Sequence, residues 1–159
     1  MNHLRRFTSV AAAATLFTSL AVAAPFTASA DVGPATAGDC QRGANGFVDI
    51  PNNQSGRAID PQTGPATILT LQFANIAGAN RGYAKLTTAA GPIFFGGGEQ
   101  VWMDWSQDNG AHWLQCGPFT ARQGTDQITS AAKNTDPSPR WKFRAGAWVD
   151  NRMYLTGWH

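Results

Sequence analysis

The chain has 159 residues, of which 43% are hydrophobic and 14% charged, a composition that suits one globular domain behind a short leader. Its 12 Lys and Arg exceed its 10 Asp and Glu by two, but Arg5 and Arg6 lie in that leader, so the remainder has ten residues of each sign. A neutral chain does not attract a polyanion, which argues against nucleic acid as a partner.

Residues 1–30 have the pattern of a secretory signal peptide. A basic pair is followed by an apolar run over 7–24 and by the small residues Ala28, Ser29 and Ala30. The sequence therefore predicts cleavage after Ala30 and a secreted protein. No later apolar run approaches membrane-spanning length, so the mature form is not expected in a membrane. Residues 31–40, small and polar with Gly and Pro, are expected to form a flexible N-terminal arm, and 41–159 a single β domain.

Two cysteines are present, Cys40 and Cys116. In an exported protein a single pair predicts one intramolecular disulfide, here closing a long loop. In the chain-entropy model such closure stabilises the fold by on the order of 4 kcal/mol. Free thiols in redox or metal chemistry are the alternative, but no C-x-x-C pattern supports it.

Period-2 alternation of apolar residues recurs along the mature chain, and no segment has a helical period over three turns. Turn clusters at 52–56 and 60–65 separate these segments. The sequence predicts an all-β fold, a small antiparallel sandwich or barrel of about seven or eight short strands. The expected strands are 47–51, 67–74, 83–88, 101–105, 112–116, 141–145 and 154–158, with 127–132 either a strand or one helical turn and 149–153 a turn.

The most informative stretch is 101–119, which predicts a β-hairpin. Ser106 and Asp108 have short side chains that can accept turn N–H groups, and Asn109-Gly110 tolerates positive φ. The spacing of Ser106, Asp108, Gly110 and Trp113 resembles the Asp-box, a hairpin motif of sialidase propellers and other secreted β proteins. That resemblance implies a structural turn rather than a catalytic Asp108, and a single copy does not imply a propeller.

Residues 93–98 join three apolar side chains, Ile93, Phe94 and Phe95, to three glycines. Two interpretations remain open, a short strand entering the core or an exposed apolar loop that docks a partner. In the second, Asp31 and Val32 of the arm would contact the same partner, ordering on binding.

Catalytic groups are scarce in the mature chain, which has one glutamate and two histidines. A Ser-His-Asp system on His112 with Ser106 or Ser130 lacks a nucleophile elbow, and Asp104 with Asp108 as paired acids conflicts with the turn role of Asp108. The chain is therefore expected to be non-enzymatic, with no metal and no cofactor.

A carbohydrate-binding alternative depends on Trp102. Because Val101, Met103 and Trp105 share one face of their strand, Trp102 is expected on the other, as an outward ring. A flat aromatic ring beside Asp104 and Gln115 would resemble a sugar-binding face. The sequence thus keeps a secreted lectin-like module open, with a glycan as ligand.

Five segments together resemble a family of small secreted actinobacterial (Streptomyces-type) proteins: 46–51, 81–86, 101–108, 113–119 and 141–145. The chain is also similar to the adaptor subunit (UmbB type) of umbrella toxin particles, which joins a lectin-bearing subunit to a toxin-carrying stalk. This resemblance implies a non-enzymatic protein-binding module that links components of an extracellular antibacterial toxin complex.

Overall fold

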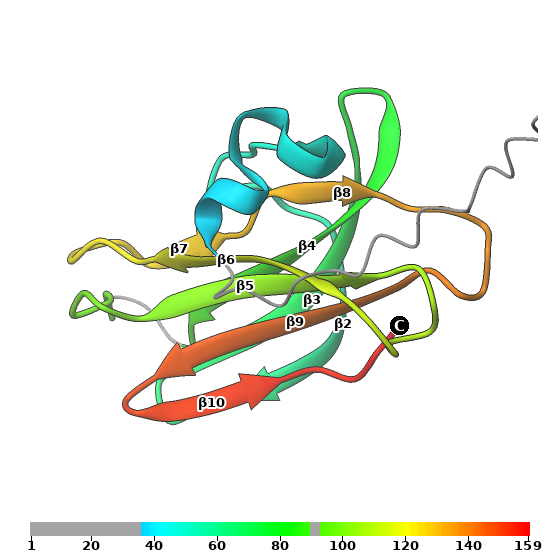
Figure 1. The fold of residues 1–159 in the computed structure, drawn as a ribbon. Coiled ribbons are helices and arrows are strands. Elements are labelled where there is room, and N and C mark those ends of the chain that lie inside the picture. Colours follow the sequence, from blue (N-terminus) through cyan, green and yellow to red (C-terminus); the bar gives the residue numbers. More distant parts are fainter. Residues whose placement is uncertain (1–35, 90–92) are drawn as a thin grey trace, which may run out of the picture.

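The computed structural model describes residues 36–89 and 93–159, which form two antiparallel sheets packed face to face (Figure 1). The first sheet has the order β1-β8-β4-β3-β2, with β7 also paired to β4; its strands are β1 (Phe47–Val48), β2 (Arg57–Thr63), β3 (Thr67–Ile76), β4 (Ala79–Thr88), β7 (Gln127–Thr129) and β8 (Ala132–Asn134). The second has the order β10-β9-β5-β6, with strands β5 (Gln100–Ser106), β6 (Leu114–Thr120), β9 (Lys142–Val149) and β10 (Arg152–Leu155). The all-β prediction is confirmed as a sandwich, and the described residues contain ten strands rather than seven or eight.

Alternating side chains from both sheets make the core. In the first sheet Leu69 pairs with Leu86 and Leu71 with Ala84, and all four are buried. The second sheet contributes another buried set from one face of β5 and β9: Val101, Met103, Phe143, Ala145, Ala147 and Val149. Because a strand alternates its side chains, the residues between these lie on the outer faces of the sheets.

Strand β2 corrects the prediction of a turn over 60–65. It pairs with β3 at the edge of the first sheet, and its register shifts between Ile59 and Gln62. Asp60 has a φ of 49° at this irregularity, next to Pro61. An edge strand tolerates a proline and a bulge because its outward N–H groups have no strand to meet. The turn signals therefore mark a distorted edge strand.

Two hairpins use two-residue turns with positive φ at both central positions. Ala77 and Gly78 connect β3 to β4, and Asp150 and Asn151 connect β9 to β10. Such turns match the twist of the flanking strands. The turn predicted at 149–153 is thus found, and 127–132, left open between strand and helical turn, forms β7 and the start of β8.

The N-terminal end of the described chain packs against β6. Two short 3-10 helices, η1 (Ala37–Asp39) and η2 (Gln41–Gly46), lie beside β6 and β1 (Figure 1). Cys40, between them, is fully buried and its Sγ lies 2.09 Å from that of Cys116 on β6. The predicted cysteine pair is confirmed. Of the arm expected over 31–40, the structure describes residues 36–40, which contain η1 and Cys40.

The outer faces of the two sheets differ in what covers them. On the first sheet the loop before β2 covers β4: the Nζ of Lys85 donates to the carbonyl of Gln54 at 2.7 Å, and both Lys85 and Tyr83 are buried. Burial lowers the pKa of Lys85 and raises that of Tyr83 to about 12. On the second sheet the outer face carries tryptophans instead. Across residues 36–89 and 93–159, no helix has the length and apolar character needed to cross a membrane.

Candidate functional site

The β5–β6 turn is held by the side chains that the sequence singled out. The Ser106 hydroxyl accepts the N–H groups of Asp108 and Gly110 at 3.2 and 2.8 Å and donates to the Asp108 carboxylate at 2.8 Å. Asp108 also accepts the backbone N–H of His112 at 2.8 Å, and its other oxygen lies 2.6 Å from the His112 Nδ1. These contacts, led by the His112 N–H, lower the pKa of Asp108. Asp108 is therefore a turn-holding group.

The fourth residue of the motif, Trp113, belongs to a cluster on the outer face of the second sheet. The guanidinium carbon of Arg144 lies 5.2 Å from the Trp113 ring centroid and 4.5 Å from that of Trp158. The two rings are 5.9 Å apart, and Trp158 also packs on Gly110, where an added Cβ would lie 3.1 Å from its ring. We call Trp113, Arg144, Trp158 and Asp104 the arginine cluster.

Asp104 is the buried member of the arginine cluster and binds Arg144. One carboxylate oxygen accepts from Nε and Nη2 of Arg144 at 2.8 and 2.7 Å. The other, Oδ1, has no hydrogen-bond partner among the described residues, and Asp104 is only 1% exposed. Burial raises the pKa of Asp104, and the hydrogen bonds from Arg144 oppose that shift. A buried carboxylate of this kind depends on its cation.

The predicted sugar-binding face is not an open surface. Trp102 does lie on the outer face, but its side chain is buried at 8% exposure. Gly146, its register partner on β9, leaves the space for the ring: an added Cβ there would lie 2.1 Å from Cε2 of Trp102. Gln115 lies opposite Asp104 and is half-buried. Trp102 thus lies on the face that alternation predicted, but its ring is covered rather than exposed, because the neighbouring strand accommodates it at Gly146.

The 93–98 segment is a loop and combines the two interpretations. Ile93 and Phe94 are 45% and 57% exposed, whereas Phe95 is 3% exposed and belongs to the core. The backbone N–H of Phe95 donates to Thr125 at 2.8 Å, and its carbonyl accepts from Gly124 at 3.1 Å. The exposed pair is thus presented beside a fixed residue. Asp31 and Val32, the proposed partner contacts of the arm, lie outside the described residues, as does the predicted signal peptide.

The catalytic alternatives do not come together around His112. Ser106 donates its proton to Asp108, as above, and the buried Ser130 donates to the carbonyl of Ala131 at 2.8 Å while accepting the N–H of Ala84. Neither hydroxyl is hydrogen-bonded to His112 in the described parts of the chain. Among those same residues, no three His, Cys, Asp or Glu side chains gather as metal ligands.

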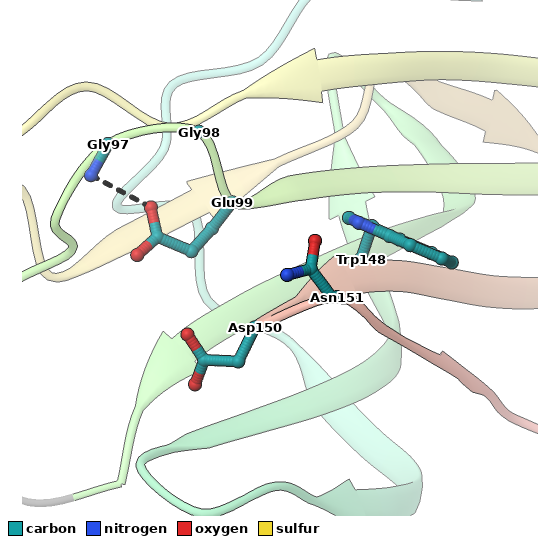
Figure 2. Close-up of a pocket in the computed structure, with 6 residues that line it drawn as sticks. All are labelled: Gly97, Gly98, Glu99, Trp148, Asp150 and Asn151. Atoms are coloured by element: carbon teal, nitrogen blue, oxygen red, sulfur yellow. Dashed lines mark hydrogen bonds between the residues drawn. The ribbon is translucent and has the colours of Figure 1, made fainter.

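A pocket that sequence reasoning missed lies at the other end of the second sheet (Figure 2). Its volume is about 210 Å³, and it is lined by Gly97, Gly98, Glu99, Trp148, Asp150 and Asn151. The Trp148 side chain is 42% exposed. The signal that could have found it is alternation: Trp148 lies between the core residues Ala147 and Val149, so its ring must point outward.

Comparison with protein-family models, curated proteins and solved structures gives no match for this chain.

Proposed function

We propose that this chain is a secreted, non-enzymatic protein-binding module that acts as an adaptor in an extracellular antibacterial toxin complex. The observation that carries the proposal is the loop tip at Ile93 and Phe94, two large apolar side chains that are 45% and 57% exposed. Exposed apolar groups next to one another are typical of protein contact sites. The toxin-complex role is supported by the family resemblance of the sequence.

The 93–98 loop is anchored next to its tip, which favours Ile93 and Phe94 as the residues that contribute most binding energy. Phe95 is buried, and the Glu99 carboxylate accepts the N–H groups of Gly96 and Gly97, each at 3.0 Å. A loop fixed directly after its tip loses less conformational entropy when a partner binds. Aromatic side chains on such a support are common among hot-spot residues.

The partner is expected to be a protein rather than a polyanion, because the mature chain has no net charge to attract one. Secretion after Ala30 is part of the same proposal. The intact mass of the protein recovered from culture medium checks it, and a chain that retains residues 1–30 would contradict it.

The binding test compares Ile93→Ser/Phe94→Ala with Met153→Ala. Met153 is a matched control because its exposure, 58%, is close to that of Phe94 while it lies on β10. A partner captured from culture supernatant by the wild-type chain is identified, purified and titrated against each variant. We expect the loop variant to lose at least about tenfold in affinity and the control to bind like wild type. Unchanged affinity of a folded loop variant would refute this surface.

A further inference from the structure

The pocket beside Trp148 combines groups from two separate parts of the chain. Figure 2 shows Glu99, from the loop before β5, on one side of the hollow and the hairpin residues Asp150 and Asn151 on the other. The Trp148 ring lies beside Asn151. The pocket is therefore lined by one aromatic residue and three residues with polar side chains.

The backbone positions the residues that line the pocket. Asp150 and Asn151 have φ values of 49° and 57° in their two-residue hairpin, so the turn conformation sets where their side chains leave the backbone. Gly97 and Gly98, with φ of 96° and 104°, form the opposite wall in a conformation that favours glycine. Glu99 is held by its hydrogen bonds to Gly96 and Gly97. Preorganisation of this kind lowers the entropic cost of binding.

The polar groups retain hydrogen-bonding capacity. In the described residues the side chains of Asp150 and Asn151 have no hydrogen-bond partner, and a carboxylate such as that of Glu99 can accept more than the two bonds it makes. Two carboxylates accept from hydroxyl groups, and the Asn151 amide both donates and accepts. None of the six lining residues is basic. The pocket thus disfavours an anion and offers acceptors to the hydroxyl groups of a neutral ligand.

Trp148 supplies the complementary apolar surface. Its exposed ring can cover a patch of C–H groups, which a pyranose presents on one face while its hydroxyls point outward. The volume of about 210 Å³ is below the roughly 300–1,000 Å³ of pockets for drug-sized ligands, and so fits a single ring.

We propose that this pocket is a carbohydrate-binding site for one uncharged hexopyranose unit, stacked on Trp148 and hydrogen-bonded by Glu99, Asp150 and Asn151. The site differs from the Trp102 face that the sequence suggested. It does not require Ile93 or Phe94, so it is independent of the proposed protein partner. An open pocket for one sugar ring is expected to bind with a Kd on the order of 1 mM.

The test observes the six tryptophan indole N–H signals in a ¹H–¹⁵N spectrum. Methyl β-glucoside, methyl β-galactoside and methyl α-mannoside are titrated separately, and Trp148→Phe assigns the Trp148 signal by its disappearance. At least one glycoside should move that signal saturably while the Trp158 signal stays in place. If none of the three moves the Trp148 signal at concentrations of about 100 times the expected Kd, the proposal is overturned.

Two variants and a charged sugar test the recognition chemistry. Saturation transfer to the binding glycoside should be lost in Trp148→Ala and retained in Trp148→Phe and in the control Phe94→Ala, which removes an exposed aromatic ring outside the pocket. Glucuronate should bind at least about tenfold more weakly than the neutral sugar because Glu99 and Asp150 repel it, and Asp150→Asn should narrow that gap. Equal binding of glucuronate, or binding that survives Trp148→Ala, would contradict the proposed site.

Discussion

Tryptophan stands at both ends of the outer face of the sheet β10-β9-β5-β6. At the end near the β5–β6 turn, Trp113 and Trp158 enclose the Arg144 guanidinium at 5.2 and 4.5 Å, and Arg144 in turn is paired with Asp104. At the end near the β9–β10 hairpin, Trp148 faces a pocket with acceptor groups around it. Trp113 and Trp148 are similarly exposed, at 45% and 42%. The rings of the arginine cluster contact each other and a cation, whereas among the described residues Trp148 has no such partner.

The difference teaches how one residue type takes different roles on one surface. A tryptophan whose ring is covered by a cation of the same molecule contributes to stability. A tryptophan with an exposed face beside unpaired acceptors is available to a ligand. We therefore assign a structural role to the arginine cluster and a binding role to the Trp148 end.

The largest effect is expected from Arg144→Ala. This change leaves the Asp104 carboxylate buried at 1% exposure without its cation, which costs about 3–5 kcal/mol of unfolding free energy. Urea unfolding measures the loss. Replacing both partners, as Asp104→Leu with Arg144→Met, should recover much of it because no charge is then buried. If Arg144→Ala loses less than about 1 kcal/mol of unfolding free energy, as expected for an exposed ion pair, the structural role assigned to the arginine cluster is contradicted.

Gly146→Ala tests whether the Trp102 ring, which lies between the two ends of the outer face, occupies the space above Gly146. The new methyl group would lie 2.1 Å from the Trp102 ring, so the ring must move, and overpacking of this kind costs about 1–3 kcal/mol. Trp102→Leu made together with Gly146→Ala should cost less than the sum of the two single changes. Strictly additive losses would mean that the ring does not occupy the space above Gly146.

A smaller, pH-dependent effect is expected from Asp108→Asn. Since hydrogen bonds hold the pKa of Asp108 below its ordinary value of 3.8, its contribution to stability is present above that pH and is lost as the pH falls below it. The variant should therefore be less stable than wild type near about pH 7, with the gap closing towards about pH 3. Asp60→Asn is a parallel test that should show the same direction of pH dependence, because the pKa of Asp60 is also lowered, chiefly by His159. A gap that does not change with pH would contradict the turn role.

Much of this fold could be read from alternation in single strands. Leu69 and Leu71, and Val101 and Met103, identified core faces correctly because burial of one face imposes a period of two. The turn contacts of Ser106 and Asp108 were also predictable because they are local in sequence. Residues 93–95 form a loop and not a short strand, and the sequence left both possibilities open because apolar content alone does not say which side chains are covered.

Features that depend on strand neighbours could not be read in this way. The burial of Trp102 on β5 depends on Gly146 on β9. The sequences of these two strands do not show that they are neighbours. The alternation of apolar and basic residues that predicts a strand over 141–145 does not continue through Gly146 and Ala147, so it does not place Trp148 on that strand, whereas β9 extends to Val149. The pocket then requires Glu99 and Asp150 to line one space, and only the folded chain brings these distant segments together.

The central claim is tested most directly by the unfolding free energies of Trp158→Ala and Trp148→Ala, measured side by side in urea. The two variants remove the same side chain from opposite ends of the outer face. We expect Trp158→Ala to lose about 2–3 kcal/mol, since its ring packs on Arg144, Trp113 and Gly110. Trp148→Ala should stay within about 0.5 kcal/mol of wild type. Equal losses, or a larger loss for Trp148→Ala, would contradict the division between a structural end and a binding end.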